Sequence, residues 1–152
     1  MNDPFDLERF VVAQNAGGTY ARAVSELTRG RKVSHWMWFV FPQLAGLGRS
    51  ATARTYAVGS LAEASAYLRH EVLGPRLLTC CSLLADLNEM SAEDVFGGID
   101  AIKLRSSMTL FHCTEPVDPI FGHILDQYFD GAADPATLKL LGSAHTPRVR
   151  PQ

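Results

Sequence analysis

Residues 118–131 read DPIFGHILDQYFDG, and this stretch decides the fold class because it carries a complete helix signature. Asp118 is a favoured N-cap residue, and Pro119 suits the first helical position. Apolar side chains then recur at the spacing of one helix face: Phe121, Ile124, Leu125, Tyr128 and Phe129. Gly131 follows where a helix-ending glycine is expected. The stretch therefore predicts a helix whose apolar face packs in the core.

The same signals extend over the rest of the chain. Asp-Pro pairs at 3–4 and 134–135 predict two further helix starts. Caps such as Ser60 and Gly30, helix propensity and apolar spacing predict helices over residues 19–29, 51–56, 60–70, 73–87 and 99–113. Because alternating strand patterns are scarce, we expect a mostly α fold: a compact single helical domain of about seven helices with irregular connections over 1–141. A flexible C-terminal tail is expected over 142–152.

Composition limits the classes of protein that the chain can belong to. With 152 residues and 47% hydrophobic residues, it suits one domain with one core. The net charge of -2 provides no basic field that would favour nucleic acid. The chain has three cysteines, an odd number, and they lack CxxC spacing. Both features argue against a disulfide framework or a metal site. No secretory signal and no apolar run of about 18 residues is evident, so we expect a cytoplasmic protein without a membrane partner.

Residues 35–41 read HWMWFVF and hold four of the 14 aromatic residues. Two interpretations stay open for this segment. A dense aromatic run is most often core. Alternatively, Trp36 and Trp38 stack on a flat ligand, since both indoles need an N–H partner and the run leads into a glycine-rich turn where backbone can approach a ligand.

Residues 46–51 read GLGRSA and match the G-x-G-x-x-A pattern of dinucleotide-binding folds. We reject that fold because Pro42 interrupts the preceding candidate strand and the rest of the chain is helical. A narrower prediction remains, in which Ser50 caps a short helix and Arg49 lies near an anionic group. Three further cations have two interpretations: Arg29, Arg31 and Lys32. The favoured one is a solvated basic turn, and the other is that they add positive charge near the same anionic group.

Residues 97–111 read GGIDAIKLRSSMTLF and place polar side chains on one helix face: Asp100, Lys103 and Ser107. Leu104, Met108 and Phe111 take another face. One interpretation is an ordinary surface ion pair. The other is a partly desolvated pair in which the carboxylate is an acid or base and the lysine binds phosphate, with three hydroxyls as hydrogen-bonding groups: Ser106, Ser107 and Thr109. No metal or cofactor motif is present.

Several sequence blocks resemble a bacterial domain-of-unknown-function family, numbered eighteen-ten. They are GRKVSHWMWFVFPQLAGLGRS at 30–50, Tyr56, EASAYL at 63–68, LGPRL at 73–77 and DAIKLRSSMTLF at 100–111. The resemblance extends over residues 5–141. This family is often labelled calpastatin, but calpain-inhibitor segments resemble disordered repeats, whereas this composition describes a compact domain. Calpain inhibition is therefore disfavoured.

A more distant resemblance lies in the order of features. An aromatic W-F-P block, a D-x-x-K block and a helix ending in a turn with Gly131, Asp134 and Thr137 are similar to the NADAR group, which is associated with NAD and ADP-ribose metabolism and N-glycosidic bond cleavage. The resemblance implies aromatic stacking on a ring, cations on phosphate and a carboxylate that assists attack at an anomeric carbon. The sequence departs from the group at 50–56, which read SATARTY without a glutamate.

Together these features predict a hydrolase that cleaves an N-glycosidic or related bond of a nucleotide or ADP-ribose-type ligand, with Asp100 and Lys103 as catalytic residues. The expected ligand-binding residues are Trp36, Trp38, Phe39, Gln43, Arg49, Ser50, Tyr56, Ser106, Ser107 and Thr109. The alternative is a non-catalytic module that binds such a small ligand, or another protein, through the same aromatic surface.

Overall fold

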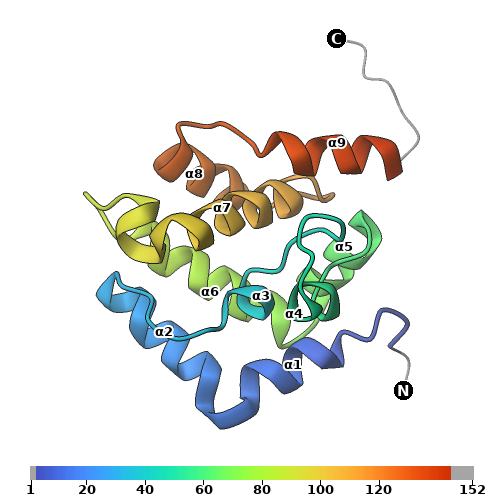
Figure 1. Cartoon of the computed structure of the whole chain (residues 1–152), viewed down its shortest axis with the longest axis horizontal. Coiled ribbons are helices and arrows are strands. Elements are labelled where there is room, and N and C mark those ends of the chain that lie inside the picture. The colour runs from blue at the N-terminus through green and yellow to red at the C-terminus, as the bar shows by residue number, and fades with distance from the viewer. Residues whose placement is uncertain (1–2, 145–152) are drawn as a thin grey trace.

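The computed structural model describes residues 3–144 and is built from helices (Figure 1). Within these residues there are nine α-helices and one 3₁₀ turn, and β pairing is limited to an isolated bridge between Leu44 and Val58. The elements are α1 Glu8–Asn15, η1 Ala16–Gly18, α2 Thr19–Arg29, α3 Met37–Val40, α4 Ala51–Thr55, α5 Leu61–Arg69, α6 Leu73–Ala85, α7 Ala92–His112, α8 Pro119–Phe129 and α9 Pro135–Ala144. The predicted mostly α class is confirmed, and the expected number of helices was close.

Helix ends follow the caps that the sequence predicted. The Asp118 carboxylate accepts the N–H of Ile120 at 2.9 Å and begins α8. The Ser60 hydroxyl accepts the N–H of Glu63 at 3.1 Å and begins α5. Gly30 ends α2 with a φ of 78°, a left-handed conformation that glycine adopts without strain. Local capping chemistry therefore sets these boundaries.

Two predicted helix starts were wrong. A helix after Pro4 was expected, but α1 begins at Glu8. The Asp3 carboxylate still accepts a main-chain N–H from Leu7, at 2.8 Å, because residues 3–7 form a turn before the helix. The helix expected from residue 99 starts earlier, at Ala92, and continues across Gly97, where φ is 82° and the helix is kinked. The part of α7 that precedes Gly97 and Gly98 was therefore not predicted from the sequence.

The helices pack around α7 and α6, with α7 against α8 and α9, and α6 against α2, α5 and α8. Figure 1 shows α8 and α9 above α7, and α1 and α2 along the opposite side of the molecule. Large side chains fill the interior between these layers: Phe10, Trp36, Phe41, Tyr67, Phe111 and Phe121. The aromatic segment thus contributes directly to the core.

The predicted division of α7 into a polar face and an apolar face was wrong in its second half. Every residue from 106 to 111 is buried, so Ser107 is as inaccessible as Leu104. The reason is that α8 and α9 both pack on α7, leaving that part of the helix without a solvent face. Exposed side chains lie before Leu104 in this helix, among them Ile99 and Ile102, and at its last residue, His112.

Residues 142–144, assigned by the sequence to a flexible tail, form the last turn of α9. The remainder of that predicted tail, 145–152, lies outside the described residues. Across residues 3–144, no helix has both the length and the apolar character needed to span a membrane.

Candidate functional site

The first feature of the site is a carboxylate held between two lysines. Asp100 lies in α7 just after the kink at Gly97, and its Oδ2 is 2.8 Å from the Nζ of Lys32. Its Oδ1 is 3.2 Å from the Nζ of Lys103, so the pair expected from the i, i+3 spacing is present. The side chains of Lys32, Asp100 and Lys103 are 7%, 18% and 19% exposed. The chain contains three lysines in all, and two of them meet at this carboxylate.

Lys32 corrects the prediction of a solvated basic turn. Arg29 and Arg31 are exposed as expected, but the Lys32 ammonium is largely buried. It donates to the carbonyl oxygen of Ser34 at 2.6 Å, and its main-chain N–H donates to the carbonyl of Val95 at 2.7 Å. These contacts tie the segment after α2 to the start of α7.

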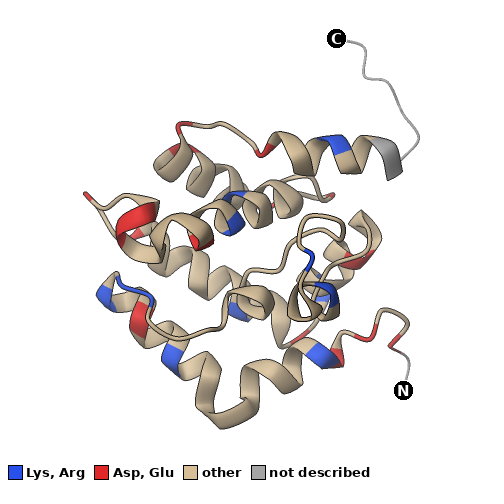
Figure 2. Cartoon of the chain, viewed as in Figure 1, with Lys and Arg blue, Asp and Glu red and all other residues tan. Residues whose placement is uncertain are grey.

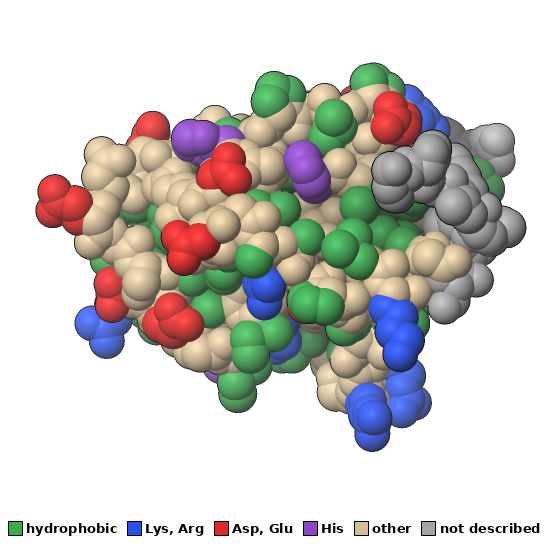
Figure 3. All heavy atoms as spheres, turned by 90° about the horizontal axis from the view of Figure 1, so that it is seen from above, with side chains coloured by type: hydrophobic (Ala, Val, Ile, Leu, Met, Phe, Trp, Pro, Cys, Tyr) green, Lys and Arg blue, Asp and Glu red, His purple; other side chains and the backbone are tan. Residues whose placement is uncertain are grey.

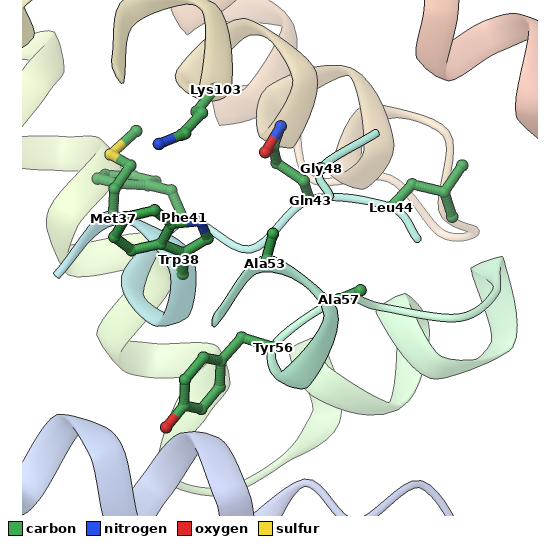
Figure 4. Close-up of a pocket in the computed structure, with 10 residues that line it drawn as sticks. All are labelled: Met37, Trp38, Phe41, Gln43, Leu44, Gly48, Ala53, Tyr56, Ala57 and Lys103. Atoms are coloured by element: carbon green, nitrogen blue, oxygen red, sulfur yellow. The ribbon is translucent and has the colours of Figure 1, made fainter. Parts of the chain in front are cut away.

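Lys103 connects the ion pairs to the aromatic segment. Its Nζ lies 4.1 Å from the centroid of the Trp38 ring, a cation–π distance. Lys103 and Trp38 both line a cavity between α7, α3 and the segment that leads to α4 (Figure 4). Its other lining residues are Met37, Phe41, Gln43, Leu44, Gly48, Ala53, Tyr56 and Ala57. In Figure 4 the side chain of Lys103 extends from α7 toward Met37 and Phe41.

The cavity is narrow. Its volume is about 280 Å³ when the space open to solvent is included, but the cavity itself measures only about 10 Å³. That space holds roughly one water molecule. Typical small-ligand pockets measure about 300–1,000 Å³. A single small polar group therefore fits in the cavity as it stands, and a larger ligand has to extend outside it.

Of three further predicted ligand-binding residues, Tyr56 and Gln43 line this cavity, whereas Phe39 does not. The Tyr56 ring points away from Lys103 in Figure 4 and lies 5.2 Å, between ring centroids, from Phe39. Phe39 is half-buried beside it. Gln43 extends from its loop toward α7, on the same side of the loop as Lys103. Gln43 is thus the polar side chain best placed to share a ligand with Lys103.

Arg49 and Ser50 lie on the exposed turn that follows the cavity-lining Gly48. The Ser50 hydroxyl accepts the N–H of Ala53 at 3.0 Å and caps α4, as predicted. Figure 2 shows basic residues on this turn and on α4, and Figure 3 shows basic side chains gathered at the lower right of the face it presents. The mouth of the cavity therefore adjoins a positively charged surface.

Trp36 is a core residue. It is fully buried, and its Nε1 donates to Glu26 Oε1 at 2.9 Å. Glu26 also accepts hydrogen bonds from the main-chain N–H groups of Val33 and Ser34 and from the Ser34 hydroxyl. Burial raises the pKa of Glu26, but these hydrogen bonds outweigh it and lower the pKa to about 2. The indole that sequence reasoning assigned to a ligand is thus occupied within the protein.

The hydroxyls predicted to bind a ligand on α7 serve packing. Ser106 Oγ lies 3.2 Å from Asp134 Oδ2, and Thr109 Oγ1 accepts the Asp134 N–H at 2.8 Å. Asp134 in turn accepts the N–H of Thr137, which begins α9. Ser107 Oγ is buried and has no hydrogen-bond partner among the described residues. The structure therefore brings together Trp38, Gln43, Asp100 and Lys103 and leaves these hydroxyls elsewhere.

In the part of the chain that the structure describes, no group of three or more His, Cys, Asp or Glu side chains is arranged to hold a metal ion. The three cysteines are free thiols.

Comparison with known proteins establishes the family. The chain matches the family described as "Protein of unknown function (DUF1810)" over residues 4–141, and it belongs to that family, as the sequence blocks predicted. It is similar to a crystal structure of the conserved hypothetical protein Rv1873 from Mycobacterium tuberculosis, with 49% sequence identity and a TM-score of 0.89. That match covers 92% of this chain and 99% of the other. No curated protein matches. These comparisons do not show the NADAR resemblance, which stays a hypothesis.

Proposed function

We propose that this protein binds a small anionic ligand of nucleotide or ADP-ribose type at Trp38 and Lys103, and that it hydrolyses an N-glycosidic or related bond in that ligand. One observation carries the proposal. The Lys103 ammonium lies between the Asp100 carboxylate and the Trp38 ring, at a cavity beside an exposed basic turn. A cation for phosphate, an aromatic face for a ring and a carboxylate for acid–base chemistry are thereby adjacent.

Binding would use Lys103 and Trp38 together. A charge-assisted hydrogen bond to phosphate is stronger than a cation–π contact with an indole. An incoming phosphate therefore draws the Lys103 ammonium away from the Trp38 ring. The ring face that the ammonium covered then becomes free to stack on a planar group of the same ligand.

The narrow cavity limits how such a ligand lies. One small group, or the attacking water, would occupy the cavity beside Gln43. The rest of the ligand would lie over the exposed turn that carries Arg49, where a second phosphate finds a cation. The site thus favours ligands with more than one anionic group.

Catalysis would depend on Asp100. While Lys103 pairs with the ligand, Oδ1 of Asp100 is released, and Oδ2 stays with Lys32. Oδ1 then accepts a proton from water as the water oxygen bonds to the anomeric carbon. The carbon–nitrogen bond breaks, its electron pair leaves with the base, and the base takes a proton from solvent.

A binding module is the second candidate, and one observation favours it. Both oxygens of Asp100 are already paired, as in a purely structural carboxylate. Apolar side chains next to the three charged residues are also unusually exposed, since Val33, Ile99 and Ile102 are 64%, 74% and 64% accessible. Such side chains suit contact with a protein partner. Calpain inhibition stays disfavoured because the chain folds into a helical domain.

Calorimetric titration with ADP-ribose and NAD tests binding. We expect Lys103→Met to weaken affinity at least about tenfold, since one charge-assisted hydrogen bond is lost. Lys139→Met, an exposed lysine on α9, is the matched control and should bind like wild type. Absence of wild-type binding, or equal affinities for the two variants, would refute the proposed site.

Release of the free base, followed by chromatography, separates the two candidates. An enzyme should lose turnover in Asp100→Asn while it keeps ligand affinity, and Asp126→Asn, an exposed carboxylate on α8, should keep both. A wild-type protein that binds the ligand and releases no base is a binding module.

A further inference from the structure

The two lysines at Asp100 differ in how firmly they are held. Lys32 donates to Asp100 at 2.8 Å and to the Ser34 carbonyl at 2.6 Å, and its side chain is 7% exposed. Lys103 makes one hydrogen bond, of 3.2 Å, and otherwise contacts the Trp38 ring. Lys32 is therefore fixed in place, whereas Lys103 has a weaker set of partners that an anion can replace.

Charge explains why two lysines are needed. With one lysine, the carboxylate and the ammonium cancel, and a ligand anion finds no net charge. With both, the three groups sum to one positive charge. The Lys103 ammonium is 3.2 Å from Asp100 Oδ1, so an anion bound to it is close enough for an unneutralised carboxylate to weaken its affinity by roughly tenfold or more.

We propose that Lys32 is a positioning residue: it neutralises Asp100 and thereby leaves Lys103 available to an anionic ligand, without touching that ligand itself. The proposal rests on the proposed function for the identity of the ligand. How strongly Asp100 holds each of the two lysines is a property of the protein alone and can be measured without ligand.

Acetylation of the ligand-free protein with acetic anhydride, followed by mass spectrometry of its peptides, measures the reaction rate of each lysine and so how strongly each is held. The chain has three lysines, so Lys139 is an internal reference. In wild type we expect Lys103 to react several-fold faster than Lys32. In Lys32→Met, Asp100 holds Lys103 alone, so Lys103 should react several-fold more slowly than in wild type. An unchanged Lys103 rate in a variant that circular dichroism shows to be folded would overturn the proposal.

Affinity for ADP-ribose then separates positioning from direct contact. Lys32→Met should bind at least about tenfold more weakly, Lys32→Arg should retain most of the affinity, and Lys32→Met with Asp100→Asn should recover it because no carboxylate charge remains. No recovery in the double variant would show that Lys32 contacts the ligand itself, which contradicts the proposal. If wild type binds no ADP-ribose, the proposed function fails, while the acetylation rates still decide the role of Lys32.

Discussion

Glu26 is the carboxylate whose role in stability the structure defines most fully. Its Oε1 accepts from the N–H groups of Val33 and Ser34 and from the Trp36 indole, at 2.8–2.9 Å, and its Oε2 accepts from the Ser34 hydroxyl at 2.7 Å. Glu26→Gln keeps the shape of the side chain and one carbonyl acceptor but removes the charge. The substitution therefore isolates what the charge contributes to the free energy of unfolding.

Two estimates of what the Glu26 charge contributes to the free energy of unfolding give a similar magnitude. A pKa that falls from 4.5 to about 2 corresponds to a stabilisation of about 3 kcal/mol. Hydrogen bonds to charged groups contribute about 1.5–3 kcal/mol each and neutral ones about 0.5–1.5 kcal/mol, and the glutamine retains the neutral ones at its carbonyl. We expect Glu26→Gln to lower the free energy of unfolding at pH 7 by about 2–3 kcal/mol.

Urea unfolding followed by circular dichroism at several pH values measures this difference. Because the pKa of Glu26 is lowered by folding, its contribution is complete above pH 4.5 and is lost as the pH falls toward 2. The difference between wild type and Glu26→Gln should therefore shrink in acid, while the exposed control Glu71→Gln stays near wild type. A difference that is the same at pH 7 and at pH 3, or absent at pH 7, would refute the reasoning.

Two further stability predictions concern core packing and a partly buried guanidinium. Leu104→Ala, in the fully buried part of α7, should cost about 2–5 kcal/mol in chemical unfolding, whereas Ile102→Ala, exposed on the same helix, should cost less than about 0.5 kcal/mol. Arg9 donates to four main-chain carbonyls and to Glu63, so Arg9→Lys should lower the free energy of unfolding by about 2 kcal/mol and Arg29→Lys by less than about 0.5 kcal/mol. Equal costs within either pair would contradict the assigned contacts.

Local signals in the sequence predicted the helices well because caps act over a few residues. Asp118, Ser60 and Gly30 each bond or turn within their own helix end, so the sequence around them contains the whole interaction. Asp3 was predicted to begin a helix directly after Pro4. Its carboxylate instead accepts the N–H groups of Leu7 and Glu8, across a turn that precedes α1.

The site was predicted only where its contacts are local. The Asp100–Lys103 pair follows from helical spacing. Lys32 comes from a distant part of the chain, and no local pattern indicates that it reaches Asp100. Trp36 and Trp38 are two residues apart, and the sequence around them does not distinguish their roles. In the structure Trp36 is bonded to Glu26 on α2 in the core, whereas Trp38 lines the cavity. Tertiary contacts of this kind are invisible to periodicity.

These two indoles also offer the most direct test of the ligand site. Their Nε1–H signals in a ¹H–¹⁵N correlation spectrum, assigned with Trp38→Phe, can be followed while ADP-ribose is added to the wild-type protein. We predict that the Trp38 signal shifts progressively and saturates, while the Trp36 signal stays in place because its N–H is buried against Glu26. If neither signal moves, or if Trp36 moves and Trp38 does not, the ligand does not bind at the Trp38–Lys103 site.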